Sequence, residues 1–221
     1  MQNYSSQVKL LFTDRGVGID RDRVCALIGR EVDLYMPIQR HTDVAVTILE
    51  GHDLTSEGCV ADAVITDRVG LLIGVQTADC VPIVAFDPHR GVIAAIHAGW
   101  RGTAKGILKS VVAALCTDFS CRAGDILMAV GPSIKSCCYE VGSDVMDAVR
   151  QATGAGNYIC SEAGRWYVDL ARANLHQALS VGLSQANVWI SPDCTSCLPD
   201  RYYSYRRTKC TGRQGGFIGM L

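Results

Sequence analysis

A cysteine and a histidine at the two ends of one predicted β-hairpin have the chemistry of a metal site or a nucleophile pair. Two apolar runs flank a turn at 87–91 and are typical of strands. Closure of this turn with five residues places Val81 opposite His97, whereas closure with four places Cys80 there. Facing side chains in a hairpin have Cβ atoms about 4.5–5.5 Å apart. In either register the thiol of Cys80 and the imidazole of His97 are held close together at a strand edge.

Zinc is the metal that best suits this pair. Zn²⁺ accepts thiolate and imidazole in mixed sets, and a catalytic zinc site takes a third protein ligand and keeps one position open. His41 precedes the predicted strand 44–49 and is the best candidate for that third ligand. We assign His52 and His89 to exposed turns, and we leave the role of His176, on a predicted helix, undecided.

A glycine-rich loop, Ala98–Gly102, follows and leads into a helix predicted to have Thr103 as its N-cap. Glycines let the backbone approach a ligand closely, and a helix N-terminus attracts anions. Arg101 would add a bidentate clamp for phosphate, although a tight turn with a surface arginine explains the loop equally well. Asp79, beside Cys80, either orients a ligand imidazole or caps a turn.

Aromatic and basic residues gather in two late segments, 202–207 and 211–214. This mixture suits a nucleobase and a phosphate, but a solvated basic face explains it nearly as well. Cys194 and Cys197 form a lone C-x-x-C motif, which is weak support for a metal or redox role because no second pair stands at zinc spacing. We interpret the neighbouring cysteines at 137–138 as packing residues.

Composition sets the class of protein. The chain has 221 residues, of which 48% are hydrophobic and 19% charged, and its 21 basic residues balance 22 acidic ones. This balance predicts no general attraction to nucleic acid or to a membrane surface. The first residues lack the pattern of a signal peptide, and no apolar run approaches the ~18 residues of a membrane span. We therefore expect the eleven cysteines to be reduced thiols in a cytoplasmic protein.

The predicted elements alternate between strands and helices, with no repeat or linker. Because the central hairpin is antiparallel, the pattern favours a mixed-sheet α/β sandwich in a single domain, 1–221, over a doubly wound parallel sheet. The expected strands are 44–49, 63–65, 71–75, 81–86, 92–96, 126–130 and 188–190, and the expected helices follow Thr103 to about 116 and span about 143–151 and 170–179.

The order of several short motifs resembles the YfiH family of laccase-domain proteins, long labelled multicopper polyphenol oxidases. The resemblance covers roughly residues 38–221. The motifs are Asp62–Thr66, Thr77–Pro82, Asp87–Pro88, His97–Gly102, Gly131–Ile134, Cys138–Val141, Asp169–Leu170 with Asn174, Tyr203–Arg207 and Gly212–Gln214.

The resemblance implies a mixed α/β sandwich with zinc bound by His41, Cys80 and His97. It also implies phosphorolysis of adenosine, inosine, guanosine and methylthioadenosine, and deamination of adenosine. In this hypothesis one metal serves both reactions by lowering the pKa of a coordinated water, while Arg101 and the helix N-terminus hold phosphate. The substrates are then purine nucleosides and inorganic phosphate, and Tyr139, Glu140 and Asp79 are candidates for the general acid.

This chain departs from the family pattern at two places. Thr42 stands where the family usually has glycine after the first histidine, and residues 1–37 form a shortened, divergent N-terminal part in which 13–17 is the remnant of a glycine-rich element.

Three other functions compete with the purine reading. Two histidines and a cysteine also suit a type-1 copper site, so Cu²⁺ is possible, but a multicopper oxidase needs His-x-His pairs and the five histidines here form none. A metal-free hydrolase would use Cys80 activated by His97. A zinc-binding partner protein without turnover is the third alternative.

Overall fold

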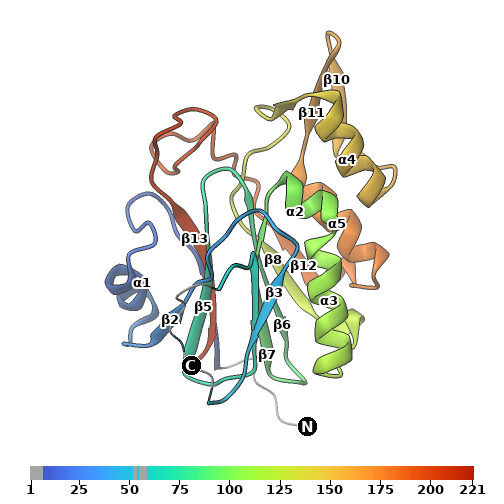
Figure 1. Ribbon diagram of the computed structural model, residues 1–221. Coiled ribbons are helices and arrows are strands. Elements are labelled where there is room, and N and C mark those ends of the chain that lie inside the picture. Colours follow the sequence, from blue (N-terminus) through green and yellow to red (C-terminus); the bar gives the residue numbers. More distant parts are fainter. Residues whose placement is uncertain (1–6, 52–53, 55–58) are drawn as a thin grey trace.

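The computed structural model describes residues 7–51, 54 and 59–221, which form two facing β-sheets with helices on both outer sides (Figure 1). The strands are β1 (Val8–Phe12), β2 (Asp33–Tyr35), β3 (Ala45–Ile48), β4 (Ala63–Thr66), β5 (Leu71–Thr77), β6 (Val81–Asp87), β7 (Val92–Ala98), β8 (Leu127–Val130), β9 (Glu140–Val141), β10 (Ile159–Glu162), β11 (Arg165–Val168), β12 (Val188–Ile190) and β13 (Gln214–Met220). The helices are α1 (Arg21–Ile28), α2 (Trp100–Lys105), α3 (Ile107–Asp118), α4 (Ser143–Thr153) and α5 (Leu170–Ser180), with 3₁₀ turns at Ala123–Asp125 and Gln185–Asn187.

Both large sheets contain parallel and antiparallel pairs. The six-stranded sheet has the order β12-β8-β6-β7-β4-β3, and the four-stranded sheet has the order β1-β13-β5-β2. In the larger sheet β12 is parallel to β8 and β3 to β4, while β6, β7 and β4 run antiparallel. A small third sheet, β10-β11-β9, projects beside α4 at one end (Figure 1). The prediction of a mixed-sheet α/β sandwich is confirmed, and no helix among the described residues is long and apolar enough to cross a membrane.

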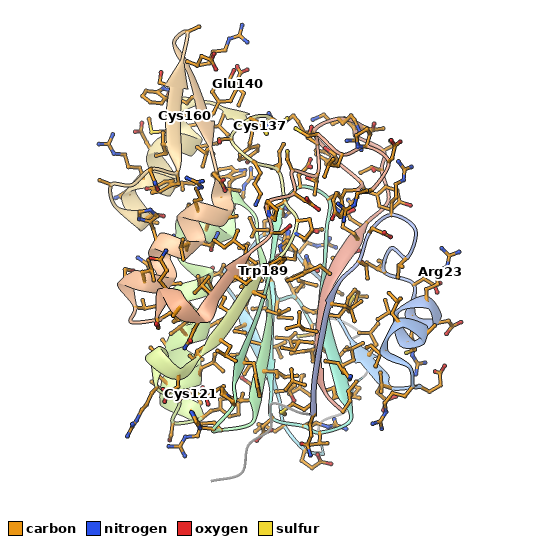
Figure 2. All side chains as sticks on the ribbon, turned by 180° about the vertical axis from the view of Figure 1, so that it is seen from behind. Arg23, Cys121, Cys137, Glu140, Cys160 and Trp189 are labelled. Carbon is orange, nitrogen blue, oxygen red and sulfur yellow. The ribbon has the colours of Figure 1, made fainter. Side chains whose placement is uncertain are left out.

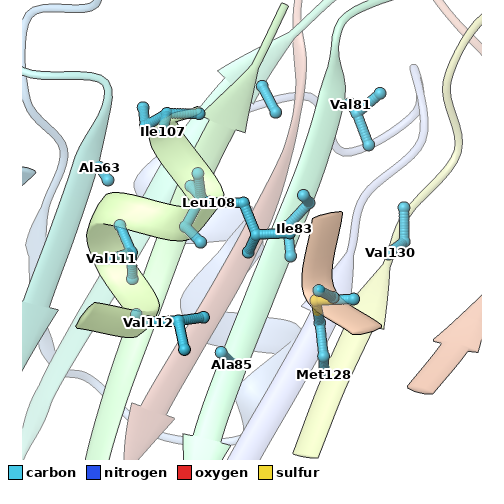
Figure 3. Close-up of a cluster of buried hydrophobic side chains, with 14 of the residues drawn as sticks. Ala63, Val81, Ile83, Ala85, Ile107, Leu108, Val111, Val112, Met128 and Val130 are labelled. Atoms are coloured by element: carbon cyan, nitrogen blue, oxygen red, sulfur yellow. The ribbon is translucent and has the colours of Figure 1, made fainter. Parts of the chain in front are cut away.

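Strands β6 and β7 are buried on both faces, which explains their nearly continuous apolar sequence. Alternate residues such as Ile83 and Ala85 pack against Leu108 and Val112 of α3 (Figure 3). The intervening residues, such as Val84 and Phe86, pack against the four-stranded sheet. The hairpin therefore forms the rigid centre of the molecule, and its ends are fixed positions for functional side chains.

The register of this hairpin differs from both predicted registers. Asp87 pairs with Val92, which leaves a loop at 88–91, and Pro82 faces His97. The carboxylate of Asp87 accepts hydrogen bonds from the backbone N–H groups of His89 and Arg90. The side chain of Asp87 therefore stabilises the turn, while its backbone pairs with Val92 as the last residue of the strand. The sequence pattern places Asp87 in the turn instead.

The helix predicted from Thr103 begins earlier and is interrupted. Gly99 is the N-cap of α2, and Gly106, in the left-handed region with φ 79°, separates α2 from α3. Thr103 is fully buried, and its hydroxyl accepts a hydrogen bond from the Asn174 amide. The prediction that Thr103 caps the helix is wrong, and Arg101 lies in the first turn of α2.

Strand β13 was not predicted, although all its residues are buried and it lies between β1 and β5. Its sequence contains three glycines and reads as a loop. The glycines leave room for close neighbours: a Cβ at Gly216 would lie 3.0 Å from Phe12 of the adjacent strand β1 and 3.0 Å from Pro82 of the other large sheet. The divergent N-terminal part supplies β1, α1 and β2, and β1 and β2 are the edges of the same sheet.

Candidate functional site

The structure brings together His41, Cys80 and His97, the three residues proposed as metal ligands. The Nε2 atom of His41 lies 3.8 Å from the Sγ atom of Cys80, and the two imidazole rings are 4.9 Å apart between centroids. One potential ligand atom from each residue lies within 4.8 Å of the others. Nitrogen, sulfur and nitrogen form a donor set that zinc accepts, with one position left for water or substrate.

Each of these side chains comes from the end of a different element. His97 is the penultimate residue of β7, Cys80 directly precedes β6, and His41 lies in the loop before β3. The backbone of His41 has φ 59°, and that of Asp79, next to Cys80, has φ 89°. Non-glycine residues in such conformations cost about 1–3 kcal/mol each and persist when neighbouring contacts hold them in place.

Asp62 provides those contacts on the histidine side. The pairing of Ala63 with Ile96 continues to place Asp62 opposite His97, and its Oδ1 atom lies 2.7 Å from Nδ1 of that histidine. The same fully buried carboxylate accepts hydrogen bonds from the backbone N–H groups of residues 40, 41 and 42 and from the Thr42 hydroxyl. It therefore orients one imidazole directly and fixes the loop that carries the other.

The hydrogen bond to Asp62 also selects the tautomer of His97. With Nδ1 donating a hydrogen bond to the carboxylate, Nε2 is the ring atom that can bind a metal once it has lost its own proton. Burial alone would raise the pKa of Asp62, but the hydrogen bonds from His97 and Thr42 hold it well below its usual range. Asp62 is therefore charged at neutral pH and stabilises a positive partner.

Cys80 and His97 shift each other's titration. Burial disfavours the thiolate of Cys80, but the charge of His97 and a hydrogen bond from His41 outweigh it and lower the pKa of the thiol to about 6. Burial likewise disfavours the imidazolium of His97, but Cys80 and Asp62 raise its pKa to about 9. Because the thiolate is the form that binds metals and attacks electrophiles, this site is prepared for either role.

Space for a ligand is provided by Gly99. A Cβ atom at this position would lie 2.9 Å from Sγ of Cys80 and 2.9 Å from Cδ2 of His41. Any side chain would therefore collide with the Cys80 thiol and the His41 imidazole. Together with the donor set, this space fits a zinc ion.

Arg101 lies in the helix that begins beside this space. Its side chain is exposed, and its guanidinium carbon lies 4.3 Å from the ring centroid of Trp100. Tyr139 lies close enough to Cys80, Arg206 and Arg101 for their charges to shift its pKa. Burial raises the pKa of Tyr139 to about 12, the charge of Cys80 adds to this, and Arg206 and Arg101 act against it. The phenol is therefore protonated at neutral pH.

The structure separates the other candidates. Asp79 accepts hydrogen bonds from the Thr195 and Ser204 hydroxyls and from the Arg206 backbone, so it anchors the segment 191–213. Asp62, and not Asp79, orients the imidazole of His97. Glu140 pairs instead with Arg165 on β11, with 3.4 Å between Oε2 and the guanidinium.

Part of the late aromatic and basic segment has a structural role. The guanidinium of Arg207 donates to the backbone carbonyls of Thr195, Ser196 and Tyr202 and so stabilises the loop itself. Arg206 donates to the carbonyl of Glu140, and its guanidinium stacks on Tyr139, which leaves it beside the site.

The remaining histidines lie elsewhere. His89 is in the hairpin turn, and His176 on α5 contacts Asn157, with 3.2 Å between Nε2 and Oδ1. His176 lines a cavity of about 620 Å³ together with Lys135, Asp169 and Arg172, and this cavity includes none of the three candidate ligands. His52 lies outside the described residues.

The family model described as multi-copper polyphenol oxidoreductase laccase matches residues 13–221. The chain belongs to this family. The resemblance to the YfiH family is also confirmed by the crystal structure of Bacillus licheniformis hypothetical protein YfiH, which has a TM-score of 0.89 and 26% sequence identity. That match covers 98% of this chain and 94% of the other.

Two curated relatives of this laccase-domain chain carry names from purine metabolism. Purine nucleoside phosphorylase YlmD from Geobacillus stearothermophilus is 37% identical over 162 residues, which are 72% of this chain and 59% of that protein. Adenosine deaminase RL5, from an unknown prokaryotic organism, is 37% identical over 186 residues, which are 79% of this chain and 70% of that protein. The chain thus spans well under two thirds of the Geobacillus protein.

The main functional residue that sequence reasoning missed is Asp62. The sequence motifs included Asp62, but no function was predicted for it. The available signal was a carboxylate directly before the apolar run 63–65, where a buried charge needs a partner.

Proposed function

We propose that this protein is a zinc-dependent purine nucleoside enzyme. It cleaves adenosine, inosine, guanosine and methylthioadenosine by phosphorolysis and deaminates adenosine. The observation that carries the proposal is the donor set of His41, Cys80 and His97, oriented by Asp62 and open at Gly99. The names of the two relatives support the choice of substrate and of both reactions.

When bound by His41, Cys80 and His97, zinc supplies a Lewis acid and lowers the pKa of a coordinated water. The protein's own contribution begins with Asp62, which holds a proton of His97 on Nδ1 so that Nε2 is the ring atom that gives up its proton and binds. Gly99 leaves the room that ligand and substrate need.

Phosphorolysis requires an anion site and a proton donor. We assign the phosphate to Arg101, whose guanidinium is exposed and can bind two oxygens at once. One phosphate oxygen attacks C1′ of the ribose, the bond from C1′ to the purine nitrogen breaks, and the leaving purine takes up a proton or a hydrogen bond. Of the three candidate acids, Glu140 pairs with Arg165, and the Asp79 carboxylate accepts hydrogen bonds from Thr195 and Ser204. We therefore assign the role to Tyr139, whose hydroxyl stays protonated and can donate a hydrogen bond to the leaving purine.

Copper-dependent phenol oxidation is the second candidate, because the family description names it. Two histidines and a cysteine match the ligands of a type-1 copper site. A multicopper oxidase also needs a trinuclear cluster of histidines. Outside the candidate site, the described part of the chain offers only His89 and His176, which lie on a hairpin turn and on α5. Because these two histidines are too few and too far apart in the fold for a trinuclear copper cluster, the nucleoside enzyme is the better-supported candidate.

The test is product analysis by chromatography with metal-quantified protein and adenosine, with and without phosphate. We expect phosphate-dependent adenine and ribose 1-phosphate, and phosphate-independent inosine. Cys80→Ala should abolish both activities and binding of this zinc, whereas Cys160→Ala, which changes an exposed cysteine on β10, should retain them. Full turnover by Cys80→Ala with zinc retained at this site would refute the assignment, and a copper-dependent blue band with phenol turnover would favour the oxidase.

A further inference from the structure

Four cysteines that the sequence analysis treated separately converge in space. Cys137 and Cys138 lie in a turn between β8 and β9, and Cys194 and Cys197 lie in a turn after β12. The Sγ atom of Cys197 lies 3.3 Å from that of Cys138 and 3.6 Å from that of Cys137. All four sulfur atoms lie within 4.8 Å of one another. The C-x-x-C motif therefore does have a second pair, which arrives from a distant segment.

Packing does not account for these cysteines. Structural free cysteines are usually buried as small apolar residues. Cys137 and Cys197 are exposed, and Cys138 is only partly buried. Figure 2 places Cys137 at the end of the molecule that carries the small sheet, close to Glu140. Cys194 is buried, but burial does not explain why three further thiols, two of them exposed, gather around it. The interpretation of Cys137 and Cys138 as packing residues is therefore corrected.

The spacing of the sulfur atoms is close to that of a tetrahedral metal site. Zinc binds thiolate sulfur at about 2.3 Å, which sets the distance between two sulfurs of a tetrahedron at about 3.8 Å. The two short distances here, 3.3 and 3.6 Å, and the upper limit of 4.8 Å bracket this value. Small side-chain rotations would bring the four sulfur atoms to the corners of a tetrahedron around one metal ion.

The backbone supports the same arrangement. The N–H group of Lys135 donates to Sγ of Cys194 at 3.5 Å, and the N–H group of Cys197 donates to the carbonyl of Cys194, which closes the turn. Backbone N–H groups aimed at sulfur stabilise negative charge on it and orient it as a ligand. The Lys135 N–H group therefore favours the thiolate form of Cys194 and holds its sulfur in place as a ligand.

We propose that Cys137, Cys138, Cys194 and Cys197 bind a second, structural zinc ion. Four protein ligands leave no open position, which is the pattern of structural and not of catalytic zinc. This site is separate from the one formed by His41, Cys80 and His97, and it does not depend on the proposed function.

The second zinc would join the two loops that border the candidate active site. Tyr139 directly follows Cys138, and Thr195 directly follows Cys194. The hydroxyl of Thr195 donates to the carboxylate of Asp79, the neighbour of Cys80, at 2.6 Å. A metal that fixes both pairs of cysteines therefore also fixes Tyr139 and Asp79 relative to each other.

The test is the zinc content of purified protein variants, measured by mass spectrometry of the metal. We expect about two zinc ions per chain in the wild type and about one in Cys80→Ser and in Cys197→Ser. The double variant Cys137→Ser/Cys138→Ser should match Cys197→Ser, and Cys160→Ser should match the wild type. If Cys197→Ser and the double variant retain all the zinc of the wild type, the proposal is wrong. A wild type with one zinc that Cys197→Ser loses and Cys80→Ser keeps would support this site and contradict the other.

A second measurement covers the case in which the cysteine variants fail to fold. Co²⁺ alone is added to metal-free Cys80→Ser protein, which retains the four-cysteine cluster. We expect the intense visible bands of tetrahedral cobalt with strong thiolate-to-cobalt charge transfer. A spectrum of six-coordinate cobalt, or an intact mass lower by two hydrogens under non-reducing conditions because Cys138 and Cys197 have formed a disulfide, would overturn the proposal.

Discussion

The Nδ1 atom of His97 lies 2.7 Å from Oδ1 of Asp62, and the two side chains are 4% and 0% exposed. This ion pair connects two neighbouring strands at the point where both enter the candidate site. The other oxygen of the carboxylate, Oδ2, accepts from the backbone N–H groups of Arg40 and Thr42 and from the Thr42 hydroxyl. A single buried charge thus aligns His97 and holds the loop that carries His41.

Asp62→Asn should therefore weaken both the fold and the metal site. Removing one partner of a buried, hydrogen-bonded pair costs about 3–5 kcal/mol, and losing the partner of a ligand histidine lowers metal affinity about 10- to 100-fold. Denaturant unfolding and zinc competition with a colorimetric chelator measure the two effects. Asp67→Asn, an exposed residue just beyond β4, is the control. Unchanged zinc affinity in Asp62→Asn would contradict the role given to Asp62.

Gly99→Ala should remove zinc from the His41–Cys80–His97 site while leaving the fold intact. The added Cβ would lie 2.9 Å from Sγ of Cys80, so the thiolate has to move away from its position. The backbone of Gly99, with φ −72° and ψ 174°, is open to alanine, and its loss as an N-cap costs about 1 kcal/mol at most. Zinc content and thermal unfolding, with Gly124→Ala as the matched control, check this expectation. Full zinc occupancy at this site in Gly99→Ala would show that the space is not needed.

Arg101→Met should separate the two proposed reactions. Loss of a bidentate guanidinium should raise the KM for phosphate at least about 10-fold, because charge-assisted hydrogen bonds contribute about 1.5–3 kcal/mol. Deamination uses no phosphate and should keep its rate. Lys105→Met removes a cation from the same helix, where it pairs with Asp43, and should change neither. Equal losses of both reactions in Arg101→Met would assign Arg101 to the fold or to the nucleoside instead.

Tyr139→Phe should slow phosphorolysis with little effect on stability. Its hydroxyl is the proposed donor to the leaving purine, and a positioned proton donor accelerates such steps about 10²- to 10⁴-fold. Steady-state rates with inosine and phosphate measure the loss, and the exposed Tyr205→Phe serves as the control. A phosphorolysis rate within twofold of the wild type would show that another group donates the proton to the leaving purine.

In metal-free protein, Cys80 should be alkylated by iodoacetamide with a midpoint near pH 6. The lowered pKa of about 6 makes the thiolate, the reactive form, dominant above that pH, and the imidazolium of His97 sustains it up to its own pKa of about 9. His97→Gln removes the positive charge and should move the midpoint upward. Peptide mapping by mass spectrometry separates Cys80 from the other cysteines. The same midpoint in both proteins would mean that His97 does not control the thiol.

Local sequence patterns predicted the parts of this molecule whose partners are close in the chain. The hairpin and helices α4 and α5 follow from apolar periodicity, and Cys80 and His97 could be paired because one turn separates their strands. The register was missed because Asp87 is a turn-forming residue type that here pairs with Val92. Sequence spacing gave no sign that the backbone of Asp87 continues the strand.

Features that depend on distant segments were not predictable in the same way. Asp62 lies 35 residues from His97, and Cys138 lies 59 residues from Cys197, so only the order of strands and loops brings them together. Strand β13 carries glycines that ordinarily disfavour strands. At Gly215 and Gly216 the rings of Phe217 and Phe12 occupy the space that a side chain would need, and the contact with Phe12 cannot be seen from this segment alone.

The position of β13 has a consequence for biosynthesis. The ribosome makes β13 after every other described element, yet β13 lies between β1 and β5 and provides the only link between them in the four-stranded sheet. A nascent chain that lacks Gln214–Met220 leaves the hydrogen-bonding edges of both strands open, and such edges invite pairing with other chains. The side chain of Gln214 also binds the backbone of Tyr203 in the loop that Asp79 anchors. Pairing of the four-stranded sheet is therefore expected to finish only after translation of that strand, and until then the edges of β1 and β5 are open to other chains.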